Sequence, residues 1–240
     1  MKVLLIGASG ATGRLVVRQL ANRNIATRIV IRKTASMPED LINNKLVECI
    51  AGNISEFDSE KNINLVKGCD AVVCCLGHNL TFKGMFGKPR FLVYLSLKNV
   101  CDAIIKNANQ QVRIILMNTT GNINNEIDEN RSVGEKIVIS MLTALLPPQR
   151  DNVYAANYLL NTVGKKNSMI VWTVVRPDSL VNNEEESPYD VVEAPTRSAI
   201  FNPGKTSRIN VSRFMAELII NNELWNKWKY KMPVIYNKEE

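Results

Sequence analysis

The stretch VLLIGASGATGR, from Val3 to Arg14, decides the fold. It opens with an unbroken apolar run, as is typical of a strand covered on both faces of a parallel sheet. Gly7, Gly10 and Gly13 then follow with the spacing GxxGxxG, and the apolar periodicity of the next residues predicts a helix. A strand, a glycine turn and a helix in this order favour a pyrophosphate site, because the first N–H groups of the helix and its positive dipole end face the turn.

A glycine-rich turn can also serve only to close a corner between a strand and a helix. Glycine additionally lets the backbone approach a diphosphate closely, and this turn stands where a dinucleotide site requires it. We therefore predict that the turn binds a dinucleotide. The residues expected to take part are Gly7, Ser9, Gly10, Ala11, Thr12, Gly13 and Arg14.

Outside this stretch, apolar runs and helical periodicity continue to alternate along the chain. This alternation predicts βαβ units in a doubly wound parallel sheet, within a single domain of residues 1–240. Such sheets bind ligands at the carboxyl ends of their strands, where residues 77–90 and 177–210 are expected to form substrate-side loops. The strands expected after the first are 26–31, 46–50, 70–76, 112–117, 169–175 and 232–236. The expected helices are 11–21, 57–66, 91–108, 133–146, 151–163 and 211–221.

The end of the second strand distinguishes NADP(H) from NAD(H). An NAD site usually carries an acid there that binds the ribose 2′-hydroxyl, but this strand ends in Val30-Ile31-Arg32-Lys33. A guanidinium binds a 2′-phosphate through paired hydrogen bonds. The sequence therefore favours NADP(H), with Arg32 as the main contact and Lys33 and Arg14 in support. The alternative is an ordinary solvated basic strand end.

Several motifs together resemble the atypical short-chain dehydrogenase/reductases, the NAD(P)H-binding group that includes NmrA-like and flavin/biliverdin-reductase-like proteins. These motifs are GASGATGR at 7–14, VIR at 30–32, AGNI at 51–54, GCDAV at 68–72, MNTTG at 117–121 and WTVVRP at 172–177. The resemblance covers nearly the whole chain. It implies a Rossmann-type fold with a small substrate-side extension in the C-terminal half.

The resemblance also implies roles for residues at the strand ends. Asn53 and Ile54 stand in place of an Asp-hydrophobic pair and are expected at the adenine. The fourth strand is expected to run beside the cofactor, the fifth to place a catalytic Thr beneath the nicotinamide, and the sixth to end in an Arg-Pro turn nearby. The residues so implied are Cys75, Leu76, Gly77, Asn118, Thr119, Thr120, Arg176 and Pro177.

One feature of the family is missing. Its members carry a Tyr-x-x-x-Lys pair on the helix before the sixth strand, where the Tyr protonates the substrate oxygen. When the chain is aligned on WTVVRP, this pair falls at Gln149 and Val153, neither of which can do so. Tyr154, next to these positions, could point into the cleft as a catalytic group. The alternative is a half-buried Tyr of the core.

The end of the fourth strand offers a further candidate. His78, the single histidine, is a possible proton donor or anion ligand, and a polar loop contact is the alternative. Glycines, aromatic rings and cations in residues 81–90 predict a lid over an aromatic or anionic substrate, with a dimer contact as the alternative. Cys74 and Cys75 are adjacent in a strand, so we expect them to be buried on opposite sides of the sheet.

Composition and charge bear on nucleic-acid, membrane and metal partners. The net charge of +7 comes from scattered basic residues rather than a basic stripe, so we do not expect a nucleic-acid partner. The longest apolar segment, 137–146, is about half of the ~20 residues that a membrane span needs. Five cysteines without metal-ligand spacing indicate reduced thiols and no metal site. We expect a cytoplasmic monomer or homodimer with a small-molecule substrate and no membrane partner.

Two functions fit these observations. The first is an NADP(H)-dependent oxidoreductase that transfers hydride to a small aromatic, flavin or quinone acceptor, because such acceptors need little help from a proton donor. The second is a non-catalytic sensor that binds NADP(H) and regulates a partner. The missing Tyr-Lys pair is the feature that favours the second function.

Overall fold

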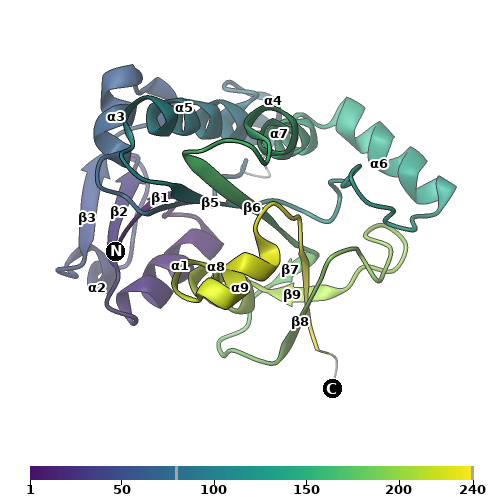
Figure 1. Cartoon of the computed structure of the whole chain (residues 1–240). Coiled ribbons are helices and arrows are strands. Elements are labelled where there is room, and N and C mark those ends of the chain that lie inside the picture. The colour runs from purple at the N-terminus through teal and green to yellow at the C-terminus, as the bar shows by residue number, and fades with distance from the viewer. Residues whose placement is uncertain (79–80, 239–240) are drawn as a thin grey trace.

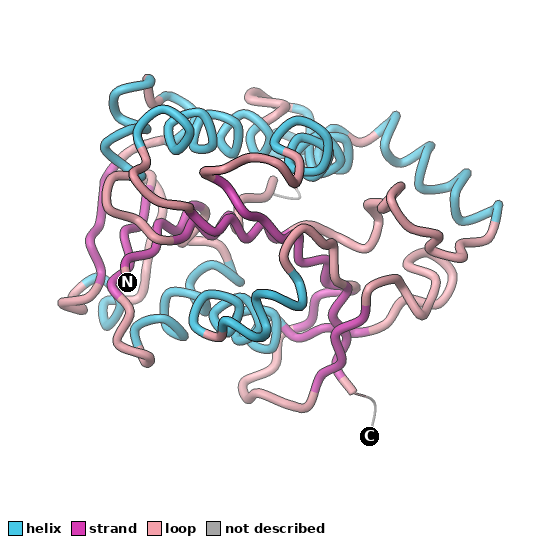
Figure 2. The backbone as a smooth tube through the Cα atoms, viewed as in Figure 1, coloured by secondary structure: helices cyan, strands magenta, loops and turns pink. Residues whose placement is uncertain are grey.

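The computed structural model describes residues 1–78 and 81–238, and an eight-stranded sheet forms its centre. The strand order is β3-β2-β1-β4-β5-β6-β10-β8, with parallel pairing from β3 through β10 and antiparallel pairing of β10 with β8. Figure 2 shows the strands, in magenta, between two layers of helices. The connections reverse direction at β1, which confirms the predicted doubly wound sheet. The strands are β1 (Lys2–Ile6), β2 (Ala26–Ile31), β3 (Val47–Ala51), β4 (Ala71–Cys74), β5 (Val112–Met117), β6 (Ile170–Pro177), β8 (Tyr189–Val192) and β10 (Val234–Asn237).

Helices cover both faces of this sheet (Figure 1). One face carries α3 (Ser59–Val66), α4 (Phe82–Phe86), α5 (Leu92–Asn107) and α7 (Pro147–Asn157), which a π-helix at Tyr158–Val163 continues. The other face carries α1 (Ala11–Ala21), α2 (Glu39–Ile42), α8 (Arg208–Ile220) and α9 (Asn222–Trp228). A further helix, α6 (Val133–Leu145), extends away from the sheet.

The sheet divides the apolar core into two layers. The side chains of β1 alternate between them: Leu4 and Ile6 pack in the layer of α5, and Val3 and Leu5 pack in the layer of α1 and α8. All four are fully buried. A central strand of a parallel sheet is covered on both faces, which explains why its sequence is a continuous apolar run instead of an alternating one.

The buried cysteines behave as apolar side chains. Cys74 and Cys75 lie in different layers of the core, as predicted. Burial raises the pKa of both thiols, that of Cys74 to about 12, so both stay protonated at neutral pH. Within the described part of the chain, no group of three or more His, Cys, Asp and Glu side chains is placed to hold a metal ion.

Several regions differ from the sequence expectation, including α2, α4 and α9, where no helix was expected. α7 begins at Pro147, not after the two prolines, because the first turn of a helix leaves N–H groups unpaired and a proline there loses nothing. Residues 177–210, expected to form a loop, contain β8 and a second sheet in which β7 (Ser179–Val181) pairs in parallel with β9 (Lys205–Ser207). These strands are short and partly polar, so no apolar run reveals them.

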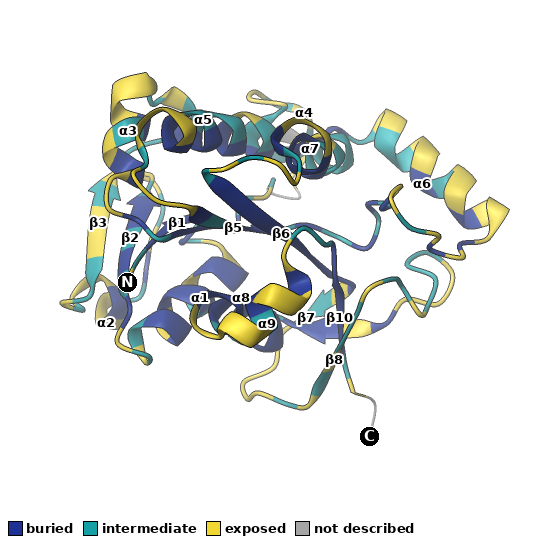
Figure 3. Cartoon of the chain, in the orientation of Figure 1, coloured by how far each residue is buried: buried dark blue, intermediate teal, exposed yellow. Residues whose placement is uncertain are grey.

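α6 is exposed along most of its length (Figure 3). Val133, Ile137, Met141 and Leu145 are spaced four residues apart, and each is more than half exposed, whereas Ile139 is buried. Most surface helices turn such an apolar stripe toward the core. Among the described helices, none combines the length and the apolar character that a membrane crossing would need.

Candidate functional site

The glycine turn joins β1 to α1 and packs directly against the end of β4. Gly7 has a φ of +84°, which favours glycine, and a Cβ at this position would lie 2.5 Å from the carbonyl carbon of Cys75. A Cβ at Gly13 would lie 2.1 Å from the carbonyl oxygen of Gly7. Neither position has room for a side chain, so the glycines are what allow α1 to start this close to the sheet.

The start of α1 is open to an anion. Its N-cap, Gly10, offers no side-chain hydrogen bond, and the first turn contains no acidic residue. The first intrahelical bond runs from the Arg14 N–H to the Gly10 carbonyl at 3.0 Å, so the N–H groups of Ala11, Thr12 and Gly13 precede the helical ladder. Free N–H groups at the positive end of a helix dipole suit a phosphate, and the turn therefore fits a dinucleotide diphosphate.

A cavity of about 320 Å³ opens beside this turn, at the carboxyl ends of β2, β3 and β4. Part of the segment formed by residues 81–90, called the lid segment below, also lines it. Residues 79 and 80, which belong to the predicted loop 77–90, lie outside the described residues. The residues predicted from the sequence that line the cavity are Gly7, Ser9, Gly10, Arg32, Asn53, Ile54, Cys75, Leu76, Gly77 and His78.

Other predicted residues lie outside the lining of this cavity. Some belong to α1 or to the basic strand end, and the rest follow β5 and β6 or lie on α7. They are Ala11, Thr12, Gly13, Arg14, Lys33, Asn118, Thr119, Thr120, Tyr154, Arg176 and Pro177.

The charged side chains that line the cavity are basic. Arg32 at the end of β2 and Lys88 in the lid segment both line it, and no carboxylate does so among the described residues. Neither cation has an ion-pair partner within residues 1–78 and 81–238. Arg14 instead donates its Nε–H to the Gly10 carbonyl at 3.5 Å, and Lys33 is exposed outside the lining. The cavity is therefore complementary to a phosphorylated ligand.

The residues after β3 are held by their own neighbours. Asn53 Oδ1 accepts the Ser55 hydroxyl at 3.0 Å, and its Nδ2 donates to a carboxylate oxygen of Glu56 at 2.8 Å. Asn53 Oδ1 also accepts the Ser55 N–H at 3.4 Å, which caps a short 3₁₀-helix at Ile54–Glu56. Asn53 and Ile54 both line the cavity, as an adenine contact requires, while the Asn53 amide already has two partners.

His78 follows β4 and is enclosed between two helices, with 5% of its side chain exposed. Its Nε2 lies 2.7 Å from Oδ2 of Asp151 on α7, and its Nδ1 lies 3.2 Å from the carbonyl oxygen of Gly84 on α4. The hydrogen bond to Asp151 raises the pKa of His78, and burial opposes this effect. Because both ring nitrogens are engaged, the geometry favours a polar contact over a proton donor.

Asp151 is fully buried and joins this contact to α5. Its Oδ2 accepts the Val93 N–H at 2.8 Å, and its Oδ1 accepts the Tyr94 N–H at 2.9 Å. These are N–H groups of the first turn of α5, whose N-cap, Phe91, supplies no side-chain hydrogen bond. Asp151 therefore caps α5 from a neighbouring helix and at the same time holds His78.

A second group of polar contacts, outside the cavity lining, lies at the end of β5. The Thr119 hydroxyl oxygen accepts the Gly121 N–H at 3.1 Å, and the Gly121 carbonyl accepts the Gln149 amide at 2.7 Å. Gln149 is the position to which the family Tyr aligns, so α7 does face the end of β5. The proton of the Thr119 hydroxyl is not used in this contact and remains able to donate.

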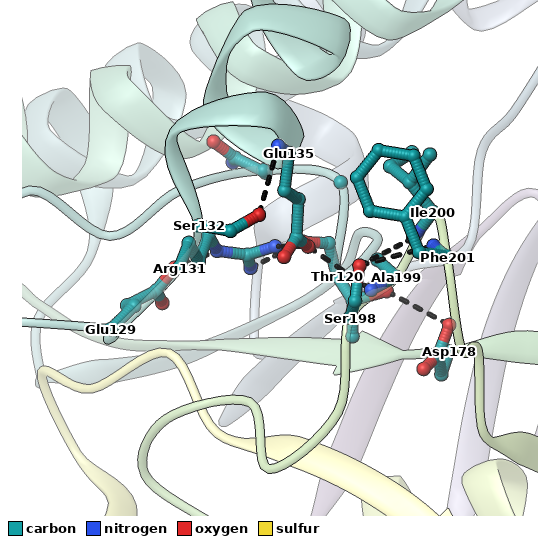
Figure 4. A network of polar contacts seen from close by, with 12 residues as sticks. Thr120, Glu129, Arg131, Ser132, Glu135, Asp178, Ser198, Ala199, Ile200 and Phe201 are labelled. Atoms are coloured by element: carbon teal, nitrogen blue, oxygen red, sulfur yellow. Dashed lines mark hydrogen bonds and ion pairs between the residues drawn. The ribbon is translucent and has the colours of Figure 1, made fainter.

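A buried ionic network lies behind the end of β5 (Figure 4). Arg131 contacts Glu129 at 2.8 Å, Glu135 at 2.7 Å and the Thr120 carbonyl at 2.7 Å. Glu135 also accepts the Ala199 N–H at 3.1 Å. The network thus connects the β5 loop and α6 to the segment before β9.

Arg176 belongs to the same network. Its Nη1 lies 2.5 Å from Glu129, its Nε donates to the Met232 carbonyl at 2.7 Å, and its side chain has no exposed surface. The Arg176 guanidinium is fully enclosed by protein, so only the backbone of the predicted Arg-Pro turn is left to lie near the nicotinamide. Thr120 is also buried and donates to Asp178 at 3.2 Å, which leaves Thr119 as the accessible Thr.

Tyr154 lies on the outer side of α7. It is 46% exposed, stacks on Phe91 at 5.3 Å between ring centroids, and meets Tyr94 edge to face at 6.2 Å. Tyr154 thus lies outside the cavity lining, and it belongs to neither layer of the buried core.

Sequence reasoning missed two residues that shape the cavity. Lys88 belongs to the cation-rich segment predicted to form a lid, but its proximity to Arg32 depends on how that segment folds over the strand ends. The lid segment lines the cavity beside the glycine turn, and Thr119 and Tyr154 lie outside that lining. Asp151 has no local sequence pattern, because its partners are 57 to 73 positions away.

Comparison with known proteins agrees with this geometry. Residues 7–222 match the family model described as NAD(P)H-binding. A search of curated proteins finds no match.

Solved structures with the same fold were found over nearly the full chain. One is a short-chain dehydrogenase/reductase from Veillonella parvula in complex with NADP (TM-score 0.68, 13% identity, covering 98% of this chain and 94% of that one). Another is ChuY, an anaerobillin reductase from Escherichia coli O157:H7 (0.68, 16%, 100% and 98%). A third, from Streptococcus pneumoniae, is proposed to be an NADH-flavin reductase (0.66, 14%, 99% and 100%). At these identities the likeness establishes the fold.

Proposed function

The chain belongs to the NAD(P)H-binding family, and we propose that it is an NADP(H)-dependent oxidoreductase of the atypical short-chain type. The acceptor we propose is a flavin, a quinone or a similar small aromatic molecule. Structural neighbours that include an anaerobillin reductase and a proposed flavin reductase support this class of reaction. Because these neighbours are only 14–16% identical to this chain, the acceptor class is argued from the residues of this chain.

The observation that carries the proposal is the unpaired Arg32 in the cavity wall. A guanidinium at the end of β2, beside the glycine turn, lies where an NAD-specific site would place a carboxylate on the ribose. Lys88 adds a second cation to the same wall. Two cations without a neighbouring carboxylate favour a ligand with an extra phosphate, which distinguishes NADP(H) from NAD(H).

Residues at the ends of different strands would bind different parts of the cofactor. The N–H groups at the start of α1 bind the diphosphate, Arg32 binds the 2′-phosphate, and Asn53 and Ile54 contact the adenine. When bound, the cofactor supplies the hydride. Thr119 is the accessible hydroxyl at the end of β5 and would orient the reacting end of the site through a donated hydrogen bond.

The acceptor class follows from what α7 lacks. Gln149 and Val153 stand where the family pair would donate a proton to a substrate oxygen, and Tyr154 is stacked on Phe91 outside the cavity. A ketone needs a proton at its oxygen as hydride arrives. Flavins and quinones delocalise the added electron pair within their rings and take the proton from water, so they suit a site without that donor.

Calorimetric titration with NADPH and NADH tests the cofactor assignment. Wild type should bind NADPH at least tenfold more tightly, and Arg32→Glu should abolish this preference while changing NADH affinity little, since about 1.4 kcal/mol corresponds to tenfold. Lys33→Glu makes the same charge change one position away, outside the cavity lining. This control variant should keep most of the preference for NADPH over NADH. Equal affinities of wild type for the two cofactors would refute the assignment.

A second function is an NADP(H) sensor without catalysis. It is favoured because both ring nitrogens of His78 are engaged, Thr120 is buried and Tyr154 lies outside the cavity lining. Turnover distinguishes the two. The oxidoreductase should oxidise NADPH with a flavin or quinone acceptor, and Thr119→Ala should lower kcat about tenfold or more. Binding of NADPH without turnover across a panel of acceptors would contradict the oxidoreductase and support the sensor.

A further inference from the structure

His78 connects the lid segment to the body of the protein. One ring nitrogen faces Asp151, which is fixed by two N–H groups of α5, and the other faces the carbonyl of Gly84. The lid segment contributes Gly84, Gly87, Lys88 and Pro89 to the cavity. His78 therefore links the segment that forms one wall of the nucleotide cavity to α7.

The two partners of the imidazole are both acceptors. A carboxylate and a carbonyl oxygen can each only receive a hydrogen bond, and a neutral imidazole carries only one N–H. The imidazolium carries two and satisfies both partners. In the neutral form, one ring nitrogen would direct its lone pair at an oxygen, and the contact to Gly84 would be the one lost, because the bond to Asp151 is shorter and charge-assisted.

We propose that His78 is a positioning residue whose imidazolium holds the lid segment over the cavity, so that nucleotide affinity depends on the protonation of His78. The inference rests on the proposed function, because it assigns a regulation to the same nucleotide site. His78 needs no contact with the reacting atoms in this role. It acts through Gly84 on the part of the wall that includes Lys88.

The charges around His78 agree with this role. Asp151 faces it from α7, and the α5 partners of that carboxylate are uncharged backbone N–H groups. From β4 the nearby Cys74 thiol stays neutral, with a pKa of about 12. Arg32 and Lys88 line the same cavity and would be neutralised by a bound phosphate. Nucleotide binding should therefore make the imidazolium easier to maintain.

The sign of the pH effect follows from the direction of the shift. The Asp151 hydrogen bond raises the pKa of His78 above its ordinary value of 6.5. The stabilisation of the lid segment is complete below 6.5 and disappears as the pH rises through the raised pKa. Binding and protonation are linked: if protonation of His78 strengthens nucleotide binding, nucleotide binding must raise the pKa of His78. The factor is the same for both, in the nucleotide affinity and in the acid dissociation constant.

The single histidine makes a direct test possible. In untagged protein, the ring-proton NMR resonances of His78 report its pKa without assignment to other residues. We expect a value above 6.5 in the free protein and a higher value with saturating NADP⁺. Calorimetry across the same pH range should show NADP⁺ affinity falling about five- to tenfold as His78 loses its proton.

Two variants separate the contributions. His78→Gln can donate to only one of the two acceptors and carries no charge, so its NADP⁺ affinity should be weaker at pH 6.5 and follow only the titration of the ligand. Lys88→Gln removes a cation from the wall but leaves the His78 contacts, so it should bind more weakly and keep the pH dependence of wild type. If His78→Gln does not fold, the titration of wild type decides alone.

The outcomes distinguish this inference from the proposed function. A His78 pKa that NADP⁺ leaves unchanged, or a pH dependence that persists fully in His78→Gln, would overturn the positioning role while nucleotide binding stands. Absence of binding by every protein at every pH would overturn the proposed function. In that case, amide exchange of residues 82–90 still tests the contact: exchange should be faster in His78→Gln than in wild type, and equal rates would refute it.

Discussion

Gly13 shows how strongly single residues constrain the glycine turn. A methyl group there would lie 2.1 Å from the Gly7 carbonyl oxygen, a backbone atom that cannot move without shifting β1. Gly77, at the end of β4, lines the same cavity, yet a Cβ there would meet nothing within 4 Å. The two glycines therefore differ in what they contribute to the structure.

Gly13→Ala should lower the free energy of unfolding by about 1–3 kcal/mol, the usual cost of forcing an extra methyl group into a packed position, and should also disrupt nucleotide binding. Gly77→Ala should change stability by about 0.5 kcal/mol or less. Urea denaturation of both variants measures the difference. Similar destabilisation by the two substitutions would contradict the packing described here.

At this scale the sequence predicted residues whose roles are local. The glycine spacing and the cations after β2 identify Gly7, Gly10 and Arg32 as residues of the cavity wall because each depends only on its own strand, turn and helix. The Arg176-Pro177 turn was expected near the nicotinamide, and the burial of the Arg176 side chain could not be foreseen, since its partner Glu129 is 47 positions away. Such pairings depend on tertiary structure.

Among the helices, α6 exposes apolar side chains that most helices would bury. Ile137 and Met141 are more than half exposed, whereas Ile139, two positions away, is buried. The helix packs mainly on α7, and Glu135 ties its first turn to the buried network.

Ile137→Lys and Met141→Lys should therefore change the free energy of unfolding by about 0.5 kcal/mol or less, as is usual for exposed positions. Ile139→Lys should cost several times more, because it places a charge in a buried apolar site. Thermal unfolding of the three variants checks this contrast. Strong destabilisation by either exposed substitution would show that the stripe is covered in solution.

Element positions were predicted where periodicity is strong. The expected helices 91–108 and 133–146 match α5 and α6 closely, and the expected strands match β1 through β6. The apolar periodicity of α6 indicates a helix but not which direction its stripe faces, because that depends on the neighbouring elements. β7 and β9 were missed since each has only three residues and is partly polar.

For the molecule as a whole, the buried ionic network joins segments that are distant in sequence. Glu129 contacts both Arg131 and Arg176, and Arg176 also reaches the backbone of the chain before β10. The alternating pattern of strands and helices predicted the sheet, whereas this network was not predicted. Arg176 becomes a neighbour of Glu129 only when the sheet has formed.

Removing one charge from the network should destabilise the folded protein strongly. Glu129→Gln leaves the buried Arg176 without a counter-charge, while Arg131 keeps Glu135, and should lower the free energy of unfolding by about 3–5 kcal/mol. Arg176→Met should cost a similar amount, and the double variant should cost less than the sum, because the two residues interact directly. Chemical denaturation of the three proteins measures the coupling. Strict additivity would mean that the ion pair contributes nothing.

The position of β10 has a consequence for biosynthesis. In the sheet it lies between β6 and β8, yet it follows both along the chain. Before residues 234–237 emerge from the ribosome, β6 offers an unpaired edge whose side chains are all buried in the finished protein. Open apolar edges recruit other chains. Nascent polypeptides halted shortly before this point are therefore the species most in need of chaperones.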